Sequence, residues 1–206
     1  MVAAVLRLLF PLSFMLCLAA TPVPVASQEE RPDEAQLKAA FLSQIGEFVQ
    51  WPPEAFRGPG EAFAIGVLGA SRVAAELERL AAGRAVQGRP LAVHRLQPGE
   101  LRGDLRGDLR GDLRGELPRR LGAESRLHIL FVGAEEAPRL PEVLASMAER
   151  PVLVVTETPG ALEAGSMINC AVEEDRIRFD VALPRAEDAG LRISARLLAM
   201  ARRLQR

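Results

Sequence analysis

Residues able to carry catalysis are few in this chain and do not form the usual motifs. The two histidines, His94 and His128, both fall in stretches that predict strands, which favours structural roles for them. No glycine–serine–glycine elbow marks a hydrolase nucleophile, and no pair of carboxylates has a spacing typical of acid–base catalysis. Two histidines and two cysteines are also too few for a histidine-rich or cysteine-rich metal site. We therefore predict that the protein is not an enzyme and holds neither a metal ion nor a cofactor.

The clearest candidate for small-ligand binding is a turn between a predicted strand and a predicted helix. Ser71 is placed to cap the helix, so backbone N–H groups near Gly69 and Ser71 could hold an anion. A plain structural turn is the alternative, because the chain has neither a dinucleotide glycine fingerprint nor a phosphate-loop lysine. Ligands of open α/β sheets bind at the carboxyl ends of the strands. This rule adds Thr156 and Glu157 to the candidate ligand-binding residues.

Candidate partner-binding residues are one aromatic residue and two arginines. Trp51 is the only tryptophan and stands at the end of a predicted helix, where it either fills the core or contacts a partner. Arg192 and Arg196 belong to a predicted C-terminal helix whose arginine-bearing face is either solvated or a docking surface. The chain has 25 arginines and one lysine, Lys38, a bias that we attribute mainly to a GC-rich genome.

The first 27 residues are typical of an export signal rather than of a folded domain. Their apolar run, residues 8–20, is too short to span a bilayer as a helix. Small residues then allow cleavage after Ser27, with cleavage after Ala20 as a second option. We predict that residues 1–27 are a cleaved signal peptide and that residues 28–206 form the exported, mature domain. An uncleaved N-terminal anchor is the alternative.

Processing would leave one cysteine and almost no net charge. Cys17 lies in the signal segment, so Cys170 would stand alone in an oxidising compartment, and no disulfide within the chain is predicted. Its apolar neighbours indicate a buried, inert thiol. The whole chain carries 26 basic and 27 acidic residues, a net charge of -1. Such a balance provides no global field to attract nucleic acid, so we predict no nucleic-acid partner.

Alternating apolar strands and amphipathic helices predict one α/β domain. Strands are predicted over residues 63–69, 90–96, 126–132 and 151–157, and a β-hairpin over residues 166–172 and 176–183. Helices are predicted over residues 33–51, 71–82, 141–150 and 184–206. This order predicts a mixed β-sheet of about five to six strands with helices on both faces, ending in the hairpin and a long C-terminal helix.

A four-residue repeat separates the second and third predicted strands. Leu-Arg-Gly-Asp occurs three times from Leu101 to Asp112, and an imperfect copy ends at Glu116. Glycine at every fourth position weakens a helix by roughly 1 kcal/mol per residue relative to alanine. We therefore predict an exposed low-complexity loop over residues 101–116, with a short amphipathic helix as the alternative.

Nine short segments follow one another in an order that is characteristic, although no single segment is specific. They are residues 38–41, 48–52, 65–69, 128–132, 151–155, 165–169, 176–179, 190–194 and 197–198. In this ordered set, which covers nearly the whole predicted mature domain, the chain resembles the YfiR-like periplasmic family. The family often has an asparagine where this chain has Ala182.

This resemblance implies a periplasmic regulatory protein. The best understood members bind the periplasmic part of an inner-membrane diguanylate cyclase and hold it inactive, which lowers cyclic-di-GMP and restrains biofilm formation. Other members act with sensor kinases or outer-membrane receptors, so an accessory role for another membrane receptor or kinase is one alternative. A periplasmic small-ligand sensor is the other. Redox control, inferred for members with cysteine pairs, does not carry over to a domain with Cys170 alone. Small α/β modules of this kind often dimerise, so a homodimer is also expected.

Overall fold

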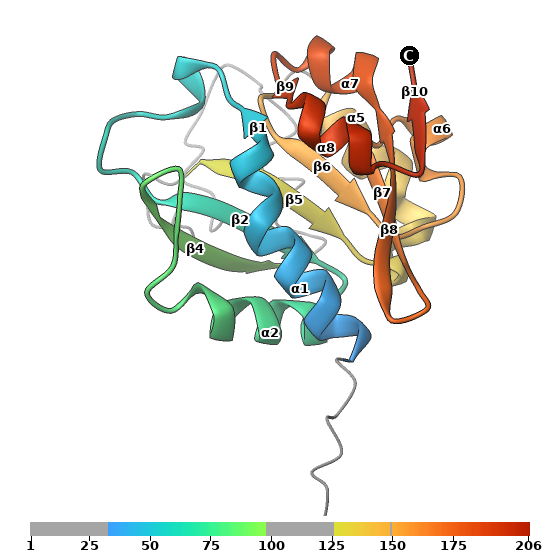
Figure 1. Cartoon of the computed structure of the whole chain (residues 1–206), viewed down its shortest axis with the longest axis horizontal. Helices are drawn as coiled ribbons and strands as arrows, with labels where there is room; N and C mark the ends of the chain where they lie inside the picture. Colours follow the sequence, from blue (N-terminus) through green and yellow to red (C-terminus); the bar gives the residue numbers. More distant parts are fainter. Residues whose placement is uncertain (1–32, 98–125, 149) are drawn as a thin grey trace, which may run out of the picture. The chain divides into compact units, whose positions relative to one another are not determined.

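An eight-stranded mixed sheet forms the centre of the described chain (Figure 1). The computed structural model describes residues 33–97, 126–148 and 150–206, so the predicted signal peptide (1–27) and repeat loop (101–116) lie outside the described residues. The strands are β2 (Phe63–Leu68), β3 (Ala85–Val86), β4 (Arg89–Leu96), β5 (Leu127–Val132), β6 (Leu153–Thr156), β7 (Ile168–Glu173), β8 (Arg176–Ala182) and β10 (Arg203–Gln205). Their order is β10-β8-β7-β6-β5-β2-β4-β3.

The predicted strand number of five to six was wrong, and the two additional strands are the two edges of the sheet. β3 and β10 are only two and three residues long, which is too short for an apolar alternation to mark them in the sequence. The longer predicted strands are all present. β2 is buried at all six of its positions, as expected for a strand in a parallel sheet covered on both faces.

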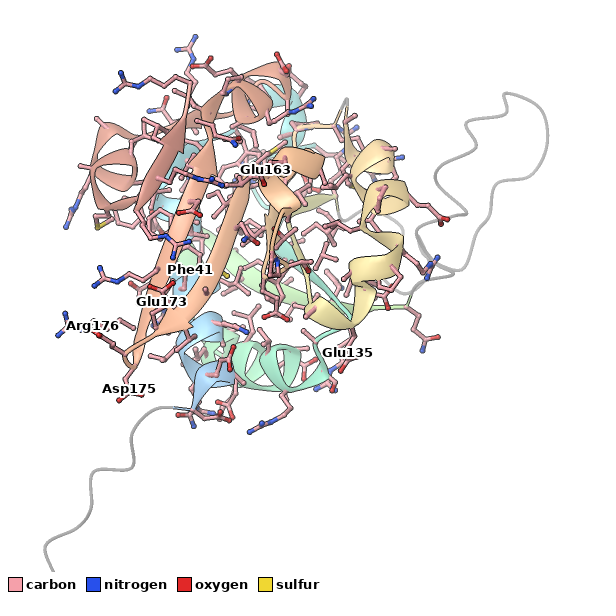
Figure 2. The ribbon with its side chains drawn as sticks, turned by 90° about the vertical axis from the view of Figure 1, so that its right-hand side faces the viewer. Phe41, Glu135, Glu163, Glu173, Asp175 and Arg176 are labelled. Atoms are coloured by element: carbon pink, nitrogen blue, oxygen red, sulfur yellow. The ribbon has the colours of Figure 1, made fainter. Side chains whose placement is uncertain are left out.

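Strand direction divides the sheet into a parallel centre and two antiparallel additions. β7, β6, β5, β2 and β4 run parallel to one another. β8 pairs antiparallel with β7, from Ile168 opposite Val181 to Glu173 opposite Arg176, which confirms the predicted hairpin (Figure 2). β3 pairs antiparallel with β4, and β10 pairs parallel with β8.

Helices cover both faces of the sheet, as the sequence predicts. α1 (Glu34–Ile45) and α2 (Ser71–Ala81) pack on one face, where they bury a cluster that includes Ile129 and Phe131 of β5. α5 (Leu140–Met147) packs on the other face against Leu130 and Val132. Alternate side chains of one strand therefore enter two separate cores, which is the geometry of a three-layer α/β domain (Figure 1).

The first helix is shorter than predicted. α1 ends at Ile45 and is followed by a 3-10 turn (Gly46–Phe48) and by β1 (Val49–Gln50), so the prediction of one helix over residues 33–51 was wrong. A side chain at Gly46 would place its Cβ 2.8 Å from Val86 Cγ1. The chain therefore packs closely against the edge strand β3 at this point. The helix does not continue beyond it.

The C-terminal segment is not a long helix, which corrects the prediction for residues 184–206. It contains α7 (Leu183–Asp188), β9 (Arg192–Ile193), α8 (Ala195–Met200) and the edge strand β10. Gly190 has φ +73° and lets the chain turn after α7. β9 then pairs antiparallel with β1, and the Ser194 hydroxyl accepts the Leu197 N–H at 3.3 Å to cap α8. The apolar residues whose spacing predicted one helix are thus divided among several shorter elements.

Candidate functional site

The four predicted ligand-binding residues do not line one cavity. Gly69 and Ser71 line a cavity of about 220 Å³ beside the ends of β2 and β4. Thr156 is fully buried, and the Glu157 side chain is only 12% exposed. The structure therefore brings Gly69 and Ser71 together, while Thr156 and Glu157 use their polar atoms in contacts within the molecule.

The turns that follow β2 and β5 touch each other at the carboxyl edge of the sheet. Gly69 has φ +63°, and a Cβ at Gly133 would lie 2.1 Å from Gly69 O. The Gly133 N–H donates to Leu68 O at 2.8 Å. Chain connections diverge between these two strands, where a parallel sheet ordinarily leaves a ligand crevice. Here the two glycine turns fill that position.

Ser71 does not cap α2, in contrast to the prediction. The residue before the helix is Ala70, and Ser71 is the first helical residue, with no side-chain hydrogen bond to the helix. Its hydroxyl is exposed beside the cavity, together with backbone N–H groups of the first turn of α2.

Glu157 joins three parts of the fold. Its carboxylate pairs with Lys38 of α1 and accepts the Ala134 N–H at 2.7 Å. Lys38, the only lysine of the chain, is 8% exposed and also contacts Glu34, with Nζ and Oε1 2.5 Å apart. Burial disfavours the charged ammonium, but the hydrogen bonds and charges of Glu157 and Glu34 outweigh it and raise the pKa of Lys38. These contacts give Glu157 a structural role in holding α1 on the sheet.

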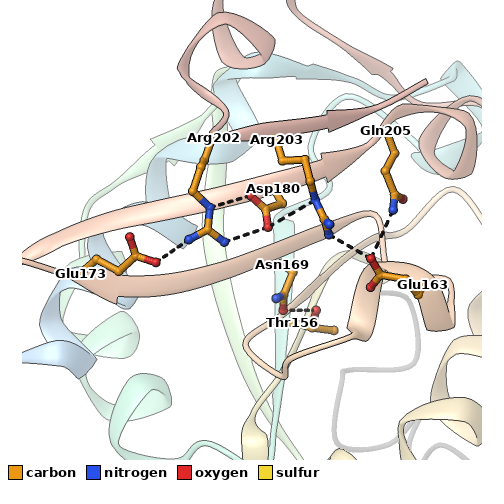
Figure 3. A network of polar contacts seen from close by, with 8 residues as sticks. All are labelled: Thr156, Glu163, Asn169, Glu173, Asp180, Arg202, Arg203 and Gln205. Carbon is orange, nitrogen blue, oxygen red and sulfur yellow. Dashed lines mark hydrogen bonds and ion pairs between the residues drawn. The ribbon is translucent and has the colours of Figure 1, made fainter.

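Thr156 connects the end of β6 to β7. Its hydroxyl donates to Asn169 Oδ1 at 2.8 Å and lies 2.9 Å from the Ser166 hydroxyl oxygen. Asn169 stands opposite Thr156 in the sheet and is the only asparagine in the chain. Asn169 also lines a cavity together with Asp180, Arg202 and Arg203, which belong to a separate polar network (Figure 3).

The polar network is organised around Asp180 of β8, which is 5% exposed (Figure 3). Arg202 donates to both carboxylate oxygens of Asp180, from Nε and from Nη2, at 2.9 Å each. Arg202 also pairs with Glu173, and Arg203 pairs with Glu163 of α6 (Ala161–Ala164) at 3.0 Å. The bidentate guanidinium of Arg202 holds the pKa of Asp180 below its usual value. The sequence did not predict this network, because the apolar spacing of residues 184–206 predicted one helix containing both arginines.

The network lines a cavity of about 500 Å³ between α6 and the strands β7, β8 and β10. Its charges largely neutralise one another, since each guanidinium faces at least one carboxylate. Both oxygens of Asp180 are engaged, so this carboxylate is not poised as a general base. The arrangement holds the C-terminal strand on the sheet and does not resemble a catalytic centre.

Trp51, predicted either to fill the core or to contact a partner, lies in the core directly after β1. It is 9% exposed, and its indole Nε1–H donates to His128 O at 3.3 Å. Its ring meets Phe63 edge-on, with the ring centroids 5.0 Å apart. The indole is therefore packed and hydrogen-bonded within the molecule.

His128 occupies an irregular position between β2 and β5, where the strand register shifts between Ala64 and Ile65. Its Nδ1 accepts the Ala64 N–H at 3.1 Å, so the imidazole replaces a backbone acceptor at the bulge. The ring is stacked between Phe56 and Phe63, at centroid distances of 4.3 and 4.9 Å. Burial lowers the pKa of His128 to about 4. These contacts confirm the structural role predicted for this histidine.

Arg192 and Arg196, the two predicted partner-binding arginines, are both exposed. Arg192 lies in β9 opposite Gln50 of β1. Arg196 lies in α8, and its guanidinium carbon is 5.5 Å from the ring centroid of Phe48. Within residues 33–97, 126–148 and 150–206, neither guanidinium forms an ion pair.

The described part of the chain holds no cluster of three or more histidine, cysteine or acidic residues suited to a metal ion. None of its helices is long and apolar enough to cross a bilayer. Cys170 is a free, buried thiol, and burial raises its pKa to about 12. A thiol with this pKa is protonated and unreactive near neutral pH, as predicted.

Two solved structures align with this chain at low sequence identity. A conserved domain protein from Vibrio cholerae aligns with a TM-score of 0.50 and 11% identity, covering 84% of this chain and 60% of that chain. The ABC domain from Streptococcus pneumoniae, solved in complex with L-Trp, aligns with a TM-score of 0.49 and 10% identity, covering 82% of this chain and 60% of that one. At 11% identity, the Vibrio cholerae alignment shows a likeness of fold alone. No curated protein sequence matches the chain significantly.

Comparison with protein families gives a match that spans nearly all the described elements. Residues 35–202, from α1 to the residue before β10, match the YfiR/HmsC-like family. This range contains the Asp180–Arg202 pair, the hairpin and the segment from β9 to α8. The chain belongs to the YfiR/HmsC-like family.

Proposed function

We propose that the protein is a periplasmic regulator that binds the periplasmic part of an inner-membrane diguanylate cyclase and holds the cyclase inactive. The cell would then contain less cyclic-di-GMP and form less biofilm. The observation that carries this proposal is the family match over residues 35–202, because the resemblance to the YfiR-like family implies this role. A binding role is also supported by the carboxylates of Glu157 and Asp180, which are engaged in contacts that join elements of the fold.

Repression of this kind is a shift between two receptor conformations. A regulator that binds the inactive conformation more tightly than the active one moves the equilibrium by its difference in affinity. Moving a receptor from about 1:99 to about 99:1 requires roughly 5.5 kcal/mol of differential binding. The protein needs no reaction of its own to achieve this. Release of the regulator would return the cyclase to its active state.

Deletion of the gene tests the proposal in the cell. The expected result is a rise in cyclic-di-GMP and in biofilm, with the membrane cyclase co-purifying with the tagged protein from wild-type cells. A matched control is a gene lacking the codons for residues 2–27, which should leave the protein in the cytoplasm and fail to complement. Unchanged cyclic-di-GMP after deletion, with no cyclase co-purified, would overturn the proposal. Co-purification of a sensor kinase or an outer-membrane receptor would identify the alternative class of partner.

A periplasmic small-ligand sensor is the second candidate, and the cavity beside Gly69 and Ser71 supports it. A ligand at about 100 times its dissociation constant would stabilise the protein by roughly 2.7 kcal/mol. A thermal-shift screen of metabolites would detect this. Bulky substitution of Ser71 should abolish a true hit at this cavity, whereas a screen without hits would count against the sensor.

A further inference from the structure

The segment from β9 to α8 presents unpaired positive charge beside an exposed apolar side chain. Met200 is 52% exposed and is the one large hydrophobic side chain exposed among the described residues. Arg196 lies one helical turn before Met200, so both lie on the same side of α8. The Arg196 guanidinium is placed over the half-buried ring of Phe48. Arg192 precedes them in β9 and is also exposed.

Positive charge is concentrated in the same part of the chain. Residues 176–206 contain eight arginines and three acidic residues, a net charge of +5, although the whole chain has a net charge of -1. Arg202 and Arg203 are matched by carboxylates in the polar network. Arg192 and Arg196 have no such partner among the described residues. Their charge is therefore available to a second molecule.

We propose that Phe48, Arg192, Arg196 and Met200, called here the β9–α8 surface, bind an acidic segment of the partner that also carries an apolar side chain. Carboxylates on the partner would pair with the guanidiniums of Arg192 and Arg196, and an apolar side chain would cover Met200. The ring of Phe48 orients the Arg196 guanidinium before binding, which lowers the entropy lost on docking. Arginine, methionine and aromatic residues are enriched at the centres of protein interfaces. This inference rests on the proposed function, since it supplies the contact surface for the signalling partner.

Charge reversal tests the surface with the full-length protein and the purified periplasmic domain of the co-purified cyclase. We expect R192E/R196E to bind this domain at least about tenfold more weakly, because the reversed charges would repel the partner's carboxylates. M200S should weaken binding less. The matched control is R176E/R178E, which makes the same change of charge at two exposed arginines of β8 and should bind like the wild type. Binding by the wild type should also weaken as salt rises from about 50 to about 500 mM.

The outcomes separate this surface from the proposed function. If wild-type protein lowers cyclic-di-GMP and R192E/R196E lowers it equally, the surface is wrong and the regulatory role stands. If deletion of the gene changes nothing, the regulatory role itself fails. If R192E/R196E changes the mass of the protein in solution, the surface joins two copies of this chain. This result would overturn the proposal that the surface binds an acidic segment of the partner. Each variant must unfold at the same temperature as the wild type, which shows that it is folded.

Discussion

At the scale of the residue, the polar side chains of this protein are used mostly to join elements that are distant in sequence. Asp180 binds the guanidinium of Arg202, and Glu157 binds the ammonium of Lys38. His128 replaces a backbone acceptor at a bulge. The two carboxylates and the imidazole Nδ1 are therefore engaged in contacts within the molecule. This is the pattern of a scaffold whose function lies on its surface.

Substitution of Asp180 by asparagine should destabilise the protein, because Arg202 would lose a bidentate charged partner. Hydrogen bonds to charged groups contribute about 1.5–3 kcal/mol, and the half-exposed Arg202 side chain keeps the loss toward the lower part of that range. Urea unfolding measures the change, with Glu187→Gln as a control at an exposed carboxylate of α7. Equal stability of the two variants would contradict the role assigned to Asp180.

His128 should make stability depend on pH in the acidic range. Its pKa is about 4 in the folded protein and 6.5 as the reference value, so the unfolded chain takes up the proton first as pH falls. Stability is therefore full above about pH 6.5 and should fall by about 2 kcal/mol between about pH 7.5 and about pH 5 from this group. Urea unfolding at the two pH values should show the loss in the wild type and a smaller loss in His128→Gln. An identical loss in both would show that another group is responsible.

Cys170 should not react with a thiol reagent in the folded protein. The thiol is 1% exposed, and its pKa is raised to about 12 by burial. We expect no labelling by a disulfide reagent near neutral pH and complete labelling in denaturant. Rapid labelling of the native protein would place the thiol in a more open environment than the structure gives it.

At the scale of the element, the hairpin of β7 and β8 closes with an unfavourable pair of turn residues. Glu174 and Asp175 have φ of 51° and 57°, the left-handed conformation of a type I′ turn. Asparagine or glycine is preferred at such positions because a glutamate side chain is strained there. The hairpin persists because six residue pairs between β7 and β8 fix its register.

Substitutions at Glu174 should separate this strain from other effects. Glu174→Asn should stabilise the protein by roughly 0.5–1 kcal/mol, because asparagine adopts positive φ more readily. Glu174→Val should destabilise it, since β-branched residues are least tolerated there. Thermal unfolding measures both. If both substitutions changed the stability in the same direction, the conformation of the turn would not be the cause of the change.

The central strands and helices could be predicted because their signals are local. An apolar run such as Phe63–Leu68 marks a buried parallel strand by itself. β9 and β10 could not be predicted, because strands of two or three residues exist only through pairing with β1 and β8. The candidate site could be predicted only in part, because its contacts also join residues that are distant in sequence. Glu157 was identified at a sheet end, but its partner Lys38 lies 119 residues away, a separation that sequence spacing cannot link.

At the scale of the whole molecule, the sheet has the layers of a ligand-binding α/β domain without an open crevice at its usual place. The turns at Gly69 and Gly133 pack against each other between β2 and β5. The segment from β9 to α8 instead presents two exposed arginines, Arg192 and Arg196, beside the exposed Met200. The fold therefore favours recognition by surface contact, in agreement with the regulatory role that we propose for this member of the YfiR/HmsC-like family.

The most direct test of this account is the rate of cyclic-di-GMP formation by the co-purified cyclase reconstituted in nanodiscs, which leave both faces of the membrane protein accessible. Addition of the protein purified from the periplasm should lower this rate in a saturable manner, and R176E/R178E should act like the wild type. A rate that stays constant at saturating concentrations of wild-type protein would contradict the proposal that it holds the cyclase inactive.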